Sequence, residues 1–120
     1  MLTGLDHVQL AAPAGCEQAA RAFYGELLGL EEIEKPESLR SRGGVWFRCG
    51  DQQVHLGVEE GFSPARKAHP AFHVEGYDAL LSSLCRAGVE VVEDHAIPDL
   101  RRSYVNDPFG NRIELVATLT

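Results

Sequence analysis

The sequence passes through the same order of structural elements twice, and this repeat constrains the fold more than any other feature. Each half begins with an alternating segment that predicts a strand, continues with a helical spacing of apolar residues, and ends with three further strand patterns. In this order, the first half predicts elements at 5–11, 16–28, 30–33, 44–49 and 53–58, and the second at 71–74 (beginning near His69), 77–87, 89–93, 101–106 and 111–117. Two copies about 60 residues long are too few and too large for a solenoid.

The repeat predicts an α+β protein built from two tandem βαβββ modules. One helix on one face of a small sheet leaves the other face free. We therefore expect the modules to form a cup-shaped mixed sheet with helices on the outer face. Module one covers about 1–60 and module two about 68–120, together making one domain over 1–120. The polar, proline-containing segment Lys35–Ser41 is expected to be a loop.

Composition and charge exclude several classes of function. The net charge of −7 argues against nucleic-acid binding, which needs concentrated Lys and Arg. No apolar run approaches the roughly 20 residues of a membrane helix, and the amino terminus lacks the features of a signal peptide. Cys16, Cys49 and Cys85 are widely spaced and odd in number, which favours a reducing compartment. We expect a cytoplasmic protein with no membrane or nucleic-acid partner.

Four side chains of types that bind metal ions fall on one side of the predicted strands. Because side chains alternate between the two faces of a strand, these residues lie opposite the large aliphatic residues of their own strands. A merely solvated face predicts Lys, Thr, Ser and Glu instead. The four residues recur at equivalent places in the modules, 48 and 45 residues apart, and predict a metal site: His7, His55, His69 and Glu114.

A fifth candidate, His73, lies four residues after His69 on the same expected face. Four residues along a strand span about 13 Å, too far for both side chains to bind one ion. Only one of the two can therefore be a ligand, and the other belongs to a pocket or to packing.

Four segments in order resemble the vicinal-oxygen-chelate superfamily of glyoxalases, bleomycin resistance proteins and extradiol dioxygenases. The segments are Leu5–Val8, Ala22–Leu30, His69–Val74 and Asp107–Leu115. The resemblance covers nearly the whole chain and implies the same fold. It implies that His7, His69 and Glu114 match the family's usual metal triad, with His69 rather than His73 as the ligand. His55 stands where glyoxalase I has a glutamate and methylmalonyl-CoA epimerase a glutamine.

The leading hypothesis is a metal-dependent enzyme of the glyoxalase-like lyase and isomerase group. Its substrate would be a small oxygenated molecule that chelates the ion through neighbouring oxygens, and its cofactor Zn, Ni, Co, Mn or Fe(II). Glu114 and His55 are the candidate catalytic residues. Two alternatives stay open. One is an Fe(II) extradiol dioxygenase using His7, His69 and Glu114, with His55 as a second-sphere acid or base. The other is a metal-free antibiotic-binding protein.

Further residues are expected to line the substrate pocket, and short relatives of this kind usually form homodimers. The resemblance therefore favours a homodimer whose sites each combine modules from two chains. Segment 101–104 is a candidate for binding an anionic substrate, although a solvated edge strand explains its charges too. The pocket candidates are Gln9, Trp46, Arg48, His73, Arg102 and Tyr104.

Overall fold

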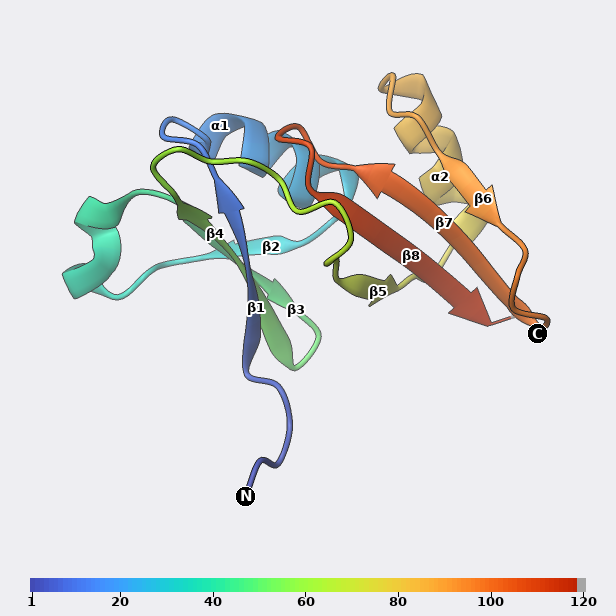
Figure 1. Cartoon of the computed structure of the whole chain (residues 1–120), viewed down its shortest axis with the longest axis horizontal. Coiled ribbons are helices and arrows are strands. Elements are labelled where there is room, and N and C mark those ends of the chain that lie inside the picture. Colours follow the sequence, from blue (N-terminus) through green and yellow to red (C-terminus); the bar gives the residue numbers. More distant parts are fainter. Residues whose placement is uncertain (119–120) are drawn as a thin grey trace. The chain divides into compact units, whose positions relative to one another are not determined.

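The computed structural model describes residues 1–118 and divides the chain into two compact units (Figure 1). The first unit is Met1–Pro64 and the second begins at Ala65. Each unit contains one four-stranded sheet, with strand order β1-β4-β3-β2 in the first and β5-β8-β7-β6 in the second. In both sheets the first strand runs parallel to the last, and the other neighbours are antiparallel. The predicted α+β fold of two βαβββ modules is confirmed.

The first unit follows the predicted element order with one addition. Its elements are β1 (His7–Ala12), α1 (Glu17–Ala20), the π-helix η1 (Arg21–Leu27), β2 (Glu31–Ile33), the 3₁₀-helix η2 (Glu37–Arg42), β3 (Val45–Cys49) and β4 (Gln52–Val58). The expected helix over 16–28 is thus one helical segment, but most of it has the wider π geometry.

The second unit repeats this order without the additional 3₁₀-helix. Its elements are β5 (Ala71–His73), α2 (Tyr77–Arg86), β6 (Val92–Asp94), β7 (Leu100–Asn106) and β8 (Arg112–Thr118). β5 is shorter than expected and leaves His69 just before the strand. None of the helices within residues 1–118 is long and apolar enough to cross a membrane.

The core of the first unit lies between the helical segment and one face of its sheet. Phe23 and Tyr24 project from η1 and are buried, and the Tyr24 ring lies 5.9 Å from the ring of Phe47 on β3. Val54 and Leu56 on β4 are buried on the same side of the sheet. Burial of this apolar surface is the main stabilising contribution at the helix–sheet contact.

The core of the second unit lies between α2 and the middle strands of its sheet. Leu84 on α2, and Ile113 and Leu115 on β8, are fully buried. The hydroxyl groups of Tyr77 and Ser103 form a buried hydrogen bond that ties the start of α2 to β7. Both units therefore bury one face of the sheet and leave the opposite face for other contacts.

The loop expected over 35–41 was wrong in part, because it contains η2. The Leu39 N–H donates to the Pro36 carbonyl, which closes the tight 3₁₀ turn, and Leu39 is half-buried. After η2 the chain passes through Gly44 at φ +88°, where an added Cβ would lie 2.1 Å from the Leu56 carbonyl oxygen. Only glycine fits there, and this contact holds the start of β3 against β4.

Candidate functional site

The strand pairing places the candidate residues on the sheet faces opposite the two cores. His55 on β4 is flanked in register by Gln9 on β1 and Trp46 on β3. Since side chains paired across a ladder share a face, these three lie together, away from buried Val54 and Leu56. The sequence alone could not assign Trp46 to this face, because both faces of β3 carry large side chains. Val45 and Phe47 lie on one face, and Trp46 and Arg48 lie on the other.

Glu114 has the same position in the second sheet that His55 has in the first. It is flanked in register by Ala71 on β5 and Tyr104 on β7. Ala71 comes two residues after His69, just as Gln9, the partner of His55, comes two residues after His7. The equivalence inferred from sequence spacing is therefore matched in the backbone register.

In the first unit, His55 is held between two other rings. Its ring lies 3.7 Å from the Trp46 ring, with planes 2° apart, and 4.2 Å from the His7 ring, with planes 18° apart. His55 is only 3% exposed. Burial, reinforced by His7 and opposed by Asp6, lowers the pKa of His55 to about 4. At neutral pH His55 is therefore an uncharged ring, the form that binds metal ions.

Hydrogen bonds fix the orientation of both imidazoles of this pair. The Nδ1 atom of His7 lies 2.9 Å from Asp6 Oδ2, so Nε2 is the ring nitrogen that Asp6 does not engage. The Nε2 atom of His55 lies 2.8 Å from Gln53 Oε1. A carboxylate or amide oxygen bonded to one imidazole nitrogen is the usual support of a metal-binding histidine.

In the second unit, His69 and Glu114 are in direct contact. His69 Nε2 lies 2.8 Å from Glu114 Oε1, and His69 Nδ1 lies 2.7 Å from the Lys67 carbonyl oxygen. A carbonyl only accepts hydrogen bonds, so Nδ1 must carry a proton. Nε2 faces the Glu114 carboxylate, so the two residues present a nitrogen and an oxygen side by side.

The second oxygen of Glu114 is held by Arg102. Arg102 Nε donates to Glu114 Oε2 at 3.1 Å, and its other nitrogens contact Tyr104 and, at 3.7 Å, Asp94. Burial raises the pKa of the Glu114 carboxyl, but hydrogen bonds from His69 and Arg102 outweigh it and leave the pKa below its usual value. Glu114 is therefore ionised at neutral pH.

The remaining pocket candidates differ in their surroundings. Arg48 is exposed and forms an ion pair with Glu31 at 3.1 Å. His73 is exposed and lies in register with Val116. Arg101, on the other face from Arg102, pairs with Asp78 and covers the ring of Tyr77.

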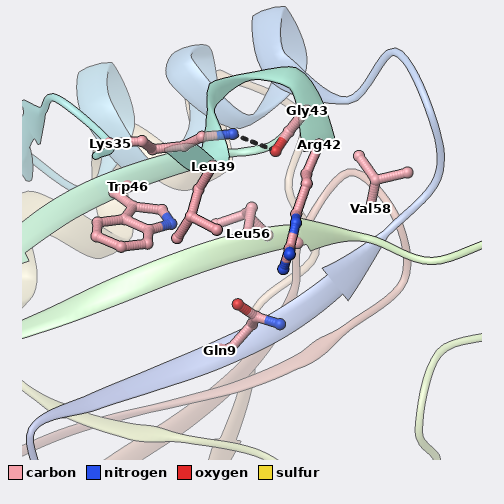
Figure 2. A pocket seen from close by; sticks show the side chains of 9 residues that line it. Gln9, Lys35, Leu39, Arg42, Gly43, Trp46, Leu56 and Val58 are labelled. Carbon is pink, nitrogen blue, oxygen red and sulfur yellow. Dashed lines mark hydrogen bonds between the residues drawn. The ribbon is translucent and has the colours of Figure 1, made fainter. Parts of the chain in front are cut away.

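A pocket of about 220 Å³ lies in the first unit, beside the candidate residues (Figure 2). Gln9 and Trp46 line it. Lys35, Leu39 and Arg42 also line it, and none of the three was predicted as a pocket residue. Lys35 and Leu39 belong to the segment expected to be a loop, and Arg42 follows directly after it.

Each unit brings together two of the four predicted metal ligands, His7 with His55 and His69 with Glu114. Within residues 1–118, no three His, Cys, Asp or Glu side chains are grouped closely enough to hold a metal ion. Neither pair alone supplies the three or four protein ligands of a typical catalytic site.

The chain is similar to known proteins in sequence and in structure. Residues 4–115 match the model of a family described as the Glyoxalase/Bleomycin resistance protein/Dioxygenase superfamily. A solved glyoxalase family protein from Bacillus anthracis is 57% identical, with a TM-score of 0.95 over 99% of this chain and 98% of that one. A glyoxalase/dioxygenase from Nostoc punctiforme is 25% identical, with a TM-score of 0.80 over 98% and 92%.

A more distant structure shares the fold. A mutant fosfomycin resistance protein from Listeria monocytogenes, complexed with Mn(II) and a dihydroxypropylphosphonic acid, is 22% identical, with a TM-score of 0.80 over 99% of this chain and 95% of that one. A search of curated protein sequences gave no match.

Proposed function

Because the chain belongs to the Glyoxalase/Bleomycin resistance protein/Dioxygenase superfamily, we propose that it is a metal-dependent enzyme of the glyoxalase-like lyase and isomerase group. Its substrate is a small oxygenated molecule. The observation that carries the proposal is the identical register of two donor pairs, one in each module. A structural relative that holds Mn(II) supports the use of a divalent ion.

The donor chemistry fits such an ion. Two ligand atoms that bind one ion at right angles, each about 2.1 Å away, lie about 3 Å apart. His69 Nε2 and Glu114 Oε1 have this spacing at 2.8 Å. Three imidazoles and one carboxylate suit Zn, Ni, Co, Mn or Fe(II). Since each unit supplies only two donors, a complete site takes one module of each kind.

The modules that make one site come either from one chain or from two. We propose the second arrangement, in a homodimer, with His7 and His55 of one chain and His69 and Glu114 of its partner forming each site. A two-fold dimer then contains two equivalent sites. Within each chain the two modules together form a single domain.

The bound ion would supply Lewis-acid stabilisation of negative charge on the substrate oxygens. The protein residues do the rest. Arg102 and His69 keep Glu114 ionised, so it serves as ligand and as proton acceptor at its carboxylate oxygens. His55, uncharged at neutral pH, presents an imidazole nitrogen rather than a cation to the ion. Trp46 covers one face of that ring and excludes water from it.

One observation favours a second candidate, an Fe(II) dioxygenase. His55 is only 3% exposed and Gln53 occupies its Nε2, whereas the side chains of His7, His69 and Glu114 are 42%, 23% and 12% exposed, so these three are the more accessible donors. Two histidines and one carboxylate are the ligand set of non-haem Fe(II) oxygenases. In this case His55 acts beside the ion as an acid or base. Oxygen uptake with catechols under Fe(II) separates this activity from the lyase and isomerase group.

Both candidate functions require a bound divalent ion, and metal analysis of untagged protein tests this requirement. The wild-type protein should contain a divalent ion, and His7→Ala and Glu114→Ala should each lose it while keeping a wild-type circular dichroism spectrum. His95→Ala is the matched control, because His95 is exposed in the loop after β6. Full metal content in both ligand variants would refute the assignment. A metal-free wild-type protein after incubation with each ion would favour the antibiotic-binding alternative.

A further inference from the structure

The pocket beside His55 carries positive charge that the proposed metal site does not use. Lys35 and Arg42 line it from the segment around η2, opposite Gln9 on β1. Figure 2 shows the Arg42 guanidinium group extending toward the Gln9 amide, with Trp46 and Leu39 beside them. Two cationic side chains thus line one small pocket.

The charge of Arg42 has no counter-ion in the part of the chain that the structure describes, residues 1–118. Arg42 forms no hydrogen bond or ion pair there, whereas Arg40, two residues earlier on η2, pairs with Glu34 at 3.5 Å. The Lys35 amine donates to the Gly43 carbonyl, which is uncharged. In a chain with a net charge of −7, cations without acidic partners at a pocket wall indicate an anionic ligand.

One carboxylate does contact this loop, but it does not face the pocket. Glu17 accepts a hydrogen bond from the Gly44 N–H, and this bond holds the pKa of the Glu17 carboxyl below its usual value. Glu17 is absent from the residues that line the pocket. Its charge serves the loop backbone, and the two cations remain available to a ligand.

The floor of the pocket is shaped to hold the Gln9 amide. A Cβ added at Gly57 would lie 2.7 Å from Gln9 Nε2, so the missing side chain makes room for the amide. Leu39, Trp46 and Val58 supply the apolar part of the wall, and Leu56 also borders the pocket although its side chain is buried. A ligand here meets two cations, an amide donor and an apolar surface.

We infer that this pocket binds an oxyanion of the substrate, a carboxylate or a phosphonate-like group. The inference rests on the proposed function and names its substrate class. Gln9 and Trp46, which line the pocket, are also the in-register neighbours of His55, so the pocket adjoins the proposed metal ligands of this unit. The substrate is therefore a small organic acid whose anion lies beside its chelating oxygens and does not itself bind the ion.

The chain offers a direct reporter, because Trp46 is its only tryptophan. Its indole N–H gives one signal in an ¹⁵N-correlated NMR spectrum of the full chain. We would titrate the protein with phenylacetate and with phenylphosphonate, using neutral phenylacetamide as the matched probe. Each titration is made with added Mn(II) and again with EDTA, and the metal content is measured on the same sample.

An oxyanion probe should shift the Trp46 signal to saturation, and phenylacetamide should not. Arg42→Gln should weaken binding at least tenfold, and Lys35→Gln should weaken it as well. Arg40→Gln, which removes the same charge from the same helix outside the pocket, should stay within twofold of wild type. The tighter of the two oxyanion probes identifies carboxylate or phosphonate as the natural group.

Unchanged binding in Arg42→Gln, or equal binding of the neutral amide, would overturn the inference. The proposed function is judged separately by the metal content. Stoichiometric metal with no oxyanion binding defeats the inference alone. Oxyanion binding that persists in EDTA, in protein that takes up no metal, supports the pocket and defeats the proposed metal enzyme.

Discussion

The imidazole of His55 and the indole of Trp46 lie face to face, with ring centroids 3.7 Å apart and planes 2° apart. His7 covers the opposite side of His55, so the ring is almost completely removed from water. A buried ring of this kind resists protonation because the charged form loses its hydration. The stack therefore makes the stability of the metal-free protein depend on pH.

We expect the free energy of unfolding to fall as the pH drops from about 6.5 to about 4. In the folded protein the pKa of His55 is lowered to about 4, while the unfolded chain has the ordinary value near 6.5. Between these values the unfolded state binds more protons, so acid favours unfolding. Urea unfolding in EDTA should show an excess slope on the order of 1 kcal/mol per pH unit.

The control for this measurement is a pair of variants. His55→Gln should lack the excess slope, and His73→Gln, which changes an exposed histidine, should keep it. Equal slopes in wild type and His55→Gln would show that His55 is accessible to protons in the folded state.

The second prediction separates His69 from His73. His69 contacts Glu114 through Nε2, whereas His73 is exposed and lies one further row along the sheet. His69→Ala should weaken metal binding at least about tenfold. His73→Ala should bind the metal as wild type does. Metal titration of both proteins decides between them, and loss of the ion only in His73→Ala would reverse the assignment.

The third prediction concerns the sharing of sites between two chains. His7→Ala and Glu114→Ala, mixed and refolded together, should regain about a quarter of the wild-type metal content. Half of the dimers then contain both variants, and in each of these one site combines the two intact modules. No recovery in a sample with demonstrated subunit exchange would show that each chain builds its own site.

The fourth prediction compares two glycines with positive φ. Gly44→Ala should destabilise the protein by roughly 3 kcal/mol or more, because the new Cβ strains the backbone and meets the Leu56 carbonyl oxygen at 2.1 Å. Gly50→Ala should cost only about 1–2 kcal/mol, since its φ is +58° but nothing lies within 4 Å. Thermal unfolding of both variants measures the difference, and equal losses would mean that the close approach contributes nothing.

Much of the fold was predictable because the strand and helix patterns occur in the same order in both modules. Alternating apolar residues identified the strands, and the repeat indicated their order, so even short β2 and β6 were expected, although β6 (Val92–Asp94) begins later than the predicted segment 89–93. The π geometry of η1 was not predictable, because apolar spacing along a helix does not distinguish α from π hydrogen bonding. η2 was missed because none of its residues is fully buried and only Leu39 is half-buried, and one residue carries no periodicity.

For the candidate site, the sequence indicated which residues share a sheet face but not which side chains contact one another. Alternation within a strand was enough to group His55 with Gln9 and Glu114 with its neighbours, and the strand register agrees. The stack of His55 on Trp46 and the contact of Arg102 with Glu114 depend on side-chain conformation across strands, which no local pattern encodes. Lys35 and Arg42 were missed since charged residues in a polar segment normally indicate solvent.

The two modules share one strand register but carry chemically different side chains at the matching positions. A change in one module therefore has a different effect from a change in the other. The first module carries the stacked rings and the pocket that η2 lines, while the second carries the Glu114 carboxylate and the arginine that holds it. Under the proposed function, a substitution or insertion between β2 and β3 would alter which molecule fits and leave the proposed donor atoms untouched. Substrate range would then drift over generations in one half of the chain while the other half preserves the reactivity.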